Sequence, residues 1–292
     1  MNFTSGGSLL ALCQDQGMTI SQIMIQREIS CFGKERHEIW ERMAKAYDIM
    51  KNAVRESEEK TLRSVGGLIG GEAKKIHQRR KTVKPVCGEV MAKAMAYAMG
   101  VLEVNSSMGL IVAAPTAGSS GVIPGVFLAV EEEFGFSDEQ MIDALFNAGA
   151  VGYLITRNAT VAGAEGGCQA EIGSASAMAA SAVVQLQGGS PQQCLDAASS
   201  VIGTMLGLVC DPIAGLVEAP CQKRNAMGAS TALISAEMIL SGVRSVVPFD
   251  EMVDAMYRVG RSIPYELRET AMGGVAATPT ACKLCNKIHG AG

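Results

Sequence analysis

Hydrophobic and polar residues follow helical spacing in the N-terminal part of the chain. Residues 21–60 place apolar side chains three and four positions apart on a heavily charged background, which is the pattern of an amphipathic helix. A glycine-rich turn at Gly66–Gly71 follows, and six basic residues lie between Lys74 and Lys84. We predict that residues 1–84 form a helical arm and a connection, both packed on a larger domain.

Beyond Pro85 charged residues become sparse, and alanine-rich runs replace the apolar–polar alternation that marks strands. Ser137, Ser190 and Pro248 stand where helices are expected to begin. The pattern predicts helices over residues 88–100, 121–134, 138–158, 172–187, 191–208, 226–241 and 249–262. No internal repeat interrupts this region, so we expect an all-α fold with one catalytic domain over residues 85–292.

Composition restricts the class of protein. The chain has 292 residues, 48% of them hydrophobic, which is enough to bury a full core. A net charge of -4 gives no general reason to bind nucleic acid. The uncharged runs 104–130 and 172–195 carry polar residues throughout, which suits buried helices better than membrane spans. Nine cysteines and no basic-then-apolar leader favour a cytoplasmic protein without disulfides.

Three of the cysteines share one setting. Cys168, Cys210 and Cys221 each have glycine or proline nearby, where a thiol can leave the helix packing and face a common point. Their spacing lacks the paired C-x2-C form of a compact zinc site. Spacing alone leaves two interpretations open, a metal centre and three buried apolar side chains. Three thiolates on a [4Fe-4S] cluster would leave one iron open to a substrate oxygen.

A second motif is TAGSSG, which sets Thr116, Ser119 and Ser120 among glycines just before a predicted helix. Main-chain N–H groups and hydroxyls at such a turn suit a carboxylate or a phosphate. A plain turn with a serine cap remains the alternative.

Four ordered blocks resemble one known family: AAPTAGSSGVIPG, GAEGGCQAEIGSASAMAA, LGLVCDPIAGLVEAPCQKRNAMGA and GGVAATPTA. They are similar to the alpha chain of the bacterial iron–sulfur-dependent L-serine dehydratases, also called L-serine ammonia-lyases. The resemblance implies an all-helical catalytic domain, a [4Fe-4S] cluster, and conversion of L-serine to pyruvate and ammonia. It implies Cys168, Cys210 and Cys221 as cluster ligands. The implied substrate-binding residues are Ser106, Ser107, Thr116, Gly118, Ser119 and Ser120.

The same resemblance implies a partner. Some members of the family carry an ACT-like regulatory domain in the same chain, and this sequence has no room for one. We therefore expect a separate beta chain. His37, His77 and His289 lie in charged or glycine-tipped segments and are expected at the surface, so the base for the alpha proton comes either from that beta chain or from a group other than histidine.

Three further features leave alternatives open. The basic segment 74–84 lacks interleaved aromatic residues and is interpreted as a solvated helix or a partner contact. Cys282 and Cys285 form a C-x2-C pair without a second pair. The pair is either half of a zinc site or part of a C-terminal tail in which a cysteine can reach an open iron. A cysteine desulfidase with the same cluster chemistry and a non-catalytic metal-binding subunit are the rival functions.

Overall fold

The computed structural model describes residues 2–290, and this part of the chain holds thirteen α-helices and no β-strand. The bounds are α1 Gly6–Gln16, α2 Ile20–Phe32, α3 Arg36–Glu59, α4 Glu72–Thr82, α5 Glu89–Ser106, α6 Val122–Phe134, α7 Asp138–Asn158, α8 Gly163–Gly166, α9 Ser174–Leu186, α10 Pro191–Met205, α11 Cys221–Leu240, α12 Phe249–Ser262 and α13 Pro279–Ile288. The predicted all-α class is confirmed.

The N-terminal segment contains three helices, α1, α2 and α3, before the glycine-rich connection. Gly33 adopts a φ of 61° and ends α2, since the left-handed conformation closes a helix and glycine takes it without strain. The chain restarts as α3 two residues beyond Lys34. Ile23 and Tyr47 of these helices belong to the same buried apolar cluster as Phe127 and Phe146 of α6 and α7. The segment therefore packs on the rest of the molecule.

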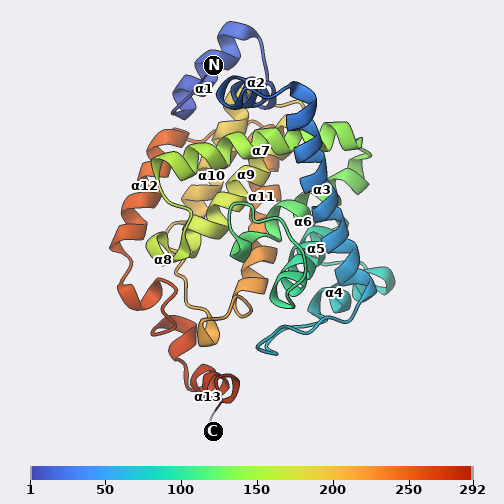
Figure 1. Ribbon diagram of the computed structural model, residues 1–292, viewed down its shortest axis with the longest axis vertical. Helices are drawn as coiled ribbons and strands as arrows, with labels where there is room; N and C mark the ends of the chain where they lie inside the picture. The colour runs from blue at the N-terminus through green and yellow to red at the C-terminus, as the bar shows by residue number, and fades with distance from the viewer. Residues whose placement is uncertain (1, 291–292) are drawn as a thin grey trace.

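Helix α9 lies at the centre of the fold. It packs against α6, α7, α10 and α11, and Figure 1 shows it enclosed among α7, α10 and α11. Residues 174–184 of this helix are all buried and are mostly alanine and serine. Small side chains let neighbouring helices approach closely. Buried hydroxyls need partners, and Ser181 donates a hydrogen bond of 2.6 Å to Asn147 of α7.

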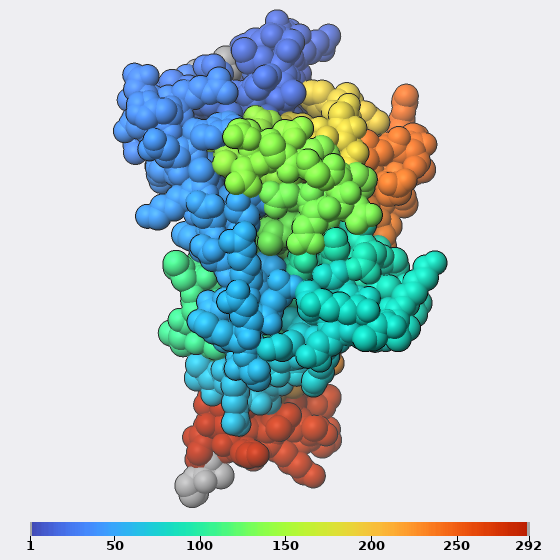
Figure 2. Space-filling model, turned by 90° about the vertical axis from the view of Figure 1, so that its right-hand side faces the viewer, coloured from blue at the N-terminus to red at the C-terminus, as the bar shows by residue number. Residues whose placement is uncertain are grey.

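The molecule is elongated. Helices α1 and α2 lie at one end and α13 at the other, and Figures 1 and 2 agree on this placement. Helix α13 packs against a short 3-10 turn at Ile213–Gly215. Among residues 2–290, none of the helices is both long enough and apolar enough to cross a membrane.

The predicted helix positions agree with the structure most closely where capping signals are strong. Helix α7 follows the Ser137 cap and α12 follows Pro248, and both keep their predicted bounds. Helix α5 runs on to Ser106, beyond the predicted end at residue 100. Helix α11 begins at Cys221 and not at residue 226.

Candidate active site

Cys168 lies where the chain turns into the central helix. The preceding Gly167 has a φ of 74°, and a Cβ there would come within 2.8 Å of the Leu208 carbonyl oxygen, so only glycine fits. Cys168 is buried and is followed by a π-helical turn, Gln169–Gly173, that leads into α9. The Gln169 side chain donates to the Met256 carbonyl at 2.9 Å and accepts from the Gly207 N–H at 2.9 Å. The amide fixes this turn against α10 and α12.

Cys210 lies on extended backbone after α10. Its N–H donates to the Leu267 carbonyl at 2.8 Å, and its carbonyl accepts from the Glu269 N–H at 2.7 Å. Within the described residues this is the single isolated β-bridge, Cys210 with Arg268. The C-terminal segment therefore holds the buried Cys210 in place.

Cys221 is the first residue of α11 and follows a cis peptide bond between Ala219 and Pro220. One turn further, the buried Asn225 donates to the Cys221 carbonyl at 3.0 Å and to the Gly118 carbonyl at 2.8 Å. Its side-chain oxygen accepts from the Gly121 N–H at 3.0 Å. Asn225 thus joins the start of α11 to the TAGSSG loop.

The structure brings two of the three thiols together with a carboxylate. The ligand atoms of Cys168, Glu171 and Cys210 all lie within 4.8 Å of one another. Burial first, and then the charges of Cys168 and Glu171, raise the pKa of Cys221 to about 12. Of the three predicted cysteines, the structure thus brings Cys168 and Cys210 together, and Glu171 joins them, while Cys221 lies outside this close group.

The donor set fits a bound metal group. The hydrogen bond with Cys168, followed by burial, raises the pKa of the Cys210 thiol. Burial likewise raises the pKa of Glu171. Such crowded donors are held in their charged form by a cationic centre, and thiolates suit iron–sulfur clusters and zinc. A Cβ at Gly163 would lie 3.1 Å from the Cys210 sulfur, so glycine there leaves room around the thiol.

One cation approaches this group from α11. Arg224 Nη2 lies 2.8 Å from Asp211 Oδ1, and its Nη1 donates to the Val209 carbonyl at 2.9 Å. Burial by itself would lower the pKa of Arg224, but the charges of Cys168 and Asp211 raise it. Asp211 also accepts from the Val275 N–H at 2.6 Å, which ties the C-terminal segment to the residue beside Cys210.

The TAGSSG loop faces the cysteine group through Glu171. The Thr116 hydroxyl donates to Glu171 Oε1 at 2.8 Å, and the Ser119 hydroxyl lies 3.1 Å from the Thr116 hydroxyl. A 3-10 turn, Ala117–Ser119, shapes the loop before α6. The hydroxyl of the buried Ser120 has no hydrogen-bond partner within the described residues, which is unusual for a buried polar group.

The serine pair at the end of α5 is held differently. Ser106 donates to the Leu102 carbonyl at 2.7 Å, and Ser107 donates to the Glu103 carbonyl at 2.7 Å. Both hydroxyl protons are therefore used within their own helix. The neighbouring Asn105 donates to the Ala117 carbonyl at 3.2 Å, which places this helix end beside the TAGSSG loop.

The glycine-rich connection is more than a turn between α3 and α4. Glu218, almost fully buried, accepts hydrogen bonds from the Ser64 hydroxyl at 2.6 Å, the Gly66 N–H at 2.6 Å and the Leu68 N–H at 2.9 Å. Since Glu218 lies three residues before Cys221, it fastens this connection to the cysteine segment.

A second buried carboxylate supports the same region. Glu103 Oε1 accepts from the Ala73 N–H at 3.0 Å and from the Gln222 amide at 2.8 Å. Burial raises the pKa of Glu103. No role was predicted from the sequence for Glu103, Glu171, Glu218 or Asn225, although a carboxylate in a charge-sparse region is a signal that could have found the three glutamates.

The histidines and the C-terminal cysteines lie apart from the thiol group. His37 is exposed, His77 pairs with Glu58 at 2.8 Å, and His289 contacts the Ala214 carbonyl at 3.0 Å. The Cys282 thiol is directed to the Ala276 carbonyl at 3.9 Å, on the outward-lying α13. All nine cysteines are free thiols.

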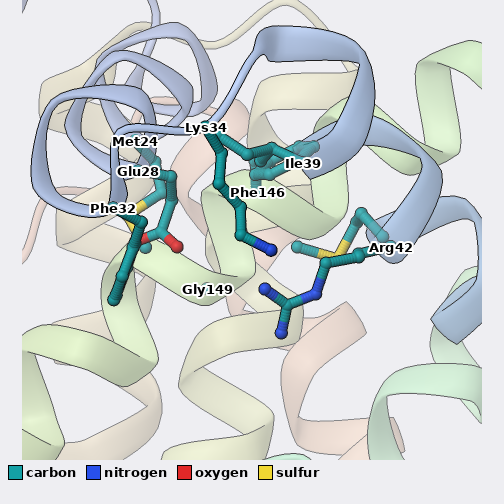
Figure 3. A pocket seen from close by; sticks show the side chains of 9 residues that line it. Met24, Glu28, Phe32, Lys34, Ile39, Arg42, Phe146 and Gly149 are labelled. Atoms are coloured by element: carbon teal, nitrogen blue, oxygen red, sulfur yellow. The ribbon is translucent and has the colours of Figure 1, made fainter.

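A pocket of about 220 Å³ opens between α2 and α3, far along the sequence from the thiol group. Figure 3 shows the charged ends of Lys34 and Arg42 turned toward the same space, with Glu28 beside it. None of the predicted site residues lines this pocket, which is bounded also by Phe146 and Gly149 of α7.

Comparison with known proteins gives one consistent family. Residues 15–276 match the family model described as serine dehydratase alpha chain. A probable L-serine dehydratase alpha chain of Bacillus subtilis is 46% identical over 288 residues, covering 99% of this chain and 96% of that protein. The L-serine dehydratase alpha chain of Peptoniphilus asaccharolyticus is 44% identical and covers 94% of each chain. An L-serine dehydratase of Streptomyces coelicolor is 35% identical, and the match spans 62% of its length.

Proposed function

Because the chain belongs to the serine dehydratase alpha-chain family, we propose that it deaminates L-serine to pyruvate and ammonia. The single observation that carries this proposal is the group formed by Cys168, Cys210 and Glu171, with Thr116 of the TAGSSG loop hydrogen-bonded to that carboxylate. Metal-type donors and a loop suited to a small polar ligand thus meet at one place. The nine free thiols support a reducing, cytoplasmic setting.

The proposed cofactor is a [4Fe-4S] cluster held by Cys168, Cys210 and Cys221. When bound by three thiolates, such a cluster supplies an iron without a protein ligand, a Lewis acid for a substrate hydroxyl. Gly163 and Gly167 keep the backbone close to the thiols. Asn225 and Glu218 hold the two flanking loops against the Cys221 segment.

The chain's own residues orient the substrate. The buried Ser120 hydroxyl, which lacks an internal partner, supplies a hydrogen-bond donor from the loop. Ser106 and Ser107, with protons already directed into α5, offer lone pairs only. Loss of the alpha proton and of the hydroxyl leaves aminoacrylate, which tautomerises and hydrolyses to pyruvate and ammonia without further help.

The base that takes the alpha proton is proposed to come from a separate beta chain. No histidine of the described residues joins the thiol group, and the relatives that match over their full length are called alpha chains. The longer relatives contain sequence beyond the match, which supports a second chain that completes the enzyme. An ACT-like regulatory part belongs to that proposed chain.

The test is an anaerobic assay of the chain co-expressed with its beta-chain candidate. We expect pyruvate formation from L-serine, and its loss in Cys168→Ala, Cys210→Ala and Cys221→Ala. Full activity in any one of these variants removes that cysteine from the ligand set. A higher rate of sulfide release from L-cysteine favours the desulfidase alternative, and colourless protein with stoichiometric zinc favours the non-catalytic alternative.

A further inference from the structure

Glu171 stands between the thiols and the TAGSSG loop, and the reaction described above gives it no role. Its Oε1 accepts from the Thr116 hydroxyl at 2.8 Å, and its Oε2 lies 3.9 Å from the Cys210 sulfur. A Cβ at Gly118 would lie 3.0 Å from Oε1, and a Cβ at Gly163 would lie 2.6 Å from Oε2. Two glycines therefore leave the space that this carboxylate occupies.

The hydrogen atoms of the loop determine what Glu171 and its neighbours offer a ligand. A hydroxyl has one proton to donate, and Thr116 gives its proton to Glu171. The Ser119 hydroxyl lies 3.1 Å from the Thr116 hydroxyl oxygen and 3.4 Å from the Thr116 carbonyl oxygen, and its one proton is shared between these two acceptors. The chain of hydrogen bonds runs from Ser119 through Thr116 to Glu171, so all three present lone pairs to a ligand.

Groups that offer a ligand only hydrogen-bond acceptors do not suit a substrate carboxylate, which needs hydrogen-bond donors. They suit an ammonium group, which donates hydrogen bonds. A second carboxylate strengthens this preference, because the charge of Glu269 acts on Glu171. The nearby cation, Arg224, is already paired with Asp211. Glu269 thus adds negative charge near Glu171, and Arg224 does not neutralise it because Arg224 is paired with Asp211.

We propose, on the basis of the proposed function, that Glu171 binds the α-ammonium group of the substrate and so selects 2-amino acids over 2-hydroxy acids. Thr116 and Ser119 serve as a relay that aims the carboxylate and adds an acceptor. Substrate carboxylate binding then falls to other donors of the loop, of which the Ser120 hydroxyl is one. Sites that hydrogen-bond a substrate group reject an analogue that lacks it, because their polar groups stay unpaired.

The test variant is Glu171→Gln, in which the amide oxygen keeps the Thr116 hydrogen bond and an NH2 group replaces the second oxygen. The matched control is Glu165→Gln, in the same motif but exposed and without a side-chain hydrogen bond or ion pair among the described residues. On the anaerobic holoenzyme, the KM of L-serine and the inhibition constant of glycerate, in which a hydroxyl replaces the ammonium group, are measured as the two readouts of binding. Iron and sulfide contents are measured on each protein.

Loss of a charge-assisted hydrogen bond is expected to weaken L-serine binding about 10- to 100-fold in Glu171→Gln. Glycerate binding should change less than about twofold, with iron content equal to that of Glu165→Gln. Equal weakening of both ligands, unchanged L-serine binding, or loss of iron would each overturn the proposal. If Glu171→Gln does not fold, Glu171→Asp must weaken L-serine more than glycerate. Wild-type protein without iron or L-serine turnover contradicts the proposed function itself, whatever the variants do.

Discussion

Replacing Glu218 by glutamine tests whether this carboxylate fastens the glycine-rich connection to the cysteine segment. Oε1 accepts one hydrogen bond, from the Gly66 N–H, and Oε2 accepts two, from the Ser64 hydroxyl and the Leu68 N–H. The glutamine amide has one acceptor oxygen and one NH2 group. When the glutamine oxygen takes the place of Oε2, the hydrogen bonds from the Ser64 hydroxyl and the Leu68 N–H are kept. The glutamine NH2 group then faces the Gly66 N–H, so two donors meet.

The structure gives the size of the effect. One hydrogen bond to a charged group is lost, worth about 1.5–3 kcal/mol, and a buried N–H is left without an acceptor. The site is only 2% exposed, so water cannot replace the missing partner. We expect the free energy of unfolding to fall by about 2–4 kcal/mol, and the melting temperature by about 5–10 °C.

Thermal unfolding of the anaerobically purified protein measures this loss, and limited proteolysis reports whether residues 64–71 become accessible. The control is Glu41→Gln on α3, an exposed position without a side-chain partner among the described residues, where we expect less than about 0.5 kcal/mol. The reasoning is refuted if both variants melt at the same temperature and the connection stays protected.

Two further substitutions test the surroundings of the thiols. Glu103→Gln keeps the hydrogen bonds from the Ala73 N–H and the Gln222 amide, which both end on one oxygen, and it removes a buried charge. Burial raises the pKa of Glu103. At neutral pH, each unit of that shift lowers the free energy of unfolding of the wild type by about 1.4 kcal/mol. The variant should therefore melt at a higher temperature than the wild type at pH 7.5. This advantage should shrink as the pH falls toward the ordinary carboxyl pKa, because Glu103 takes up a proton at a higher pH in the folded protein than in the unfolded one. A difference in melting temperature that does not change with pH would contradict this. Gly163→Ala should fold but lose about half or more of its iron, because the new Cβ would lie 2.6 Å from Glu171 Oε2 and 3.1 Å from the Cys210 sulfur and would displace both donors. Normal iron content would contradict the crowding.

Local signals in the sequence predicted much of the fold. Ser137 and Pro248 mark helix starts through hydrogen bonds and backbone geometry that depend only on near neighbours, so α7 and α12 were predicted with their observed bounds. The break at Gly33, where α2 ends, lies inside the amphipathic pattern of residues 21–60, and that pattern alone does not show it. The settings of Cys168 and Cys210 left a metal centre and buried apolar side chains both open, and the family resemblance favoured the metal centre.

Long-range pairings could not be read from local pattern. Cys210 is held by Leu267 and Glu269, more than fifty residues away in the sequence. Glu218 reaches back to Ser64 and Gly66, which lie 154 and 152 residues earlier in the sequence. Such contacts depend on how helices pack, so the sequence indicates that a buried carboxylate needs partners without saying which ones.

The central claim is that three cysteines of this chain hold a [4Fe-4S] cluster, and metal analysis tests it most directly. Iron and acid-labile sulfide are measured per chain after anaerobic purification, with Cys194→Ala as the control because Cys194 is equally buried and lies outside the group. We predict about four irons per chain in the wild type and in Cys194→Ala, and a marked loss in Cys168→Ala, Cys210→Ala and Cys221→Ala. Stoichiometric zinc, or full iron in the three variants, would contradict the account.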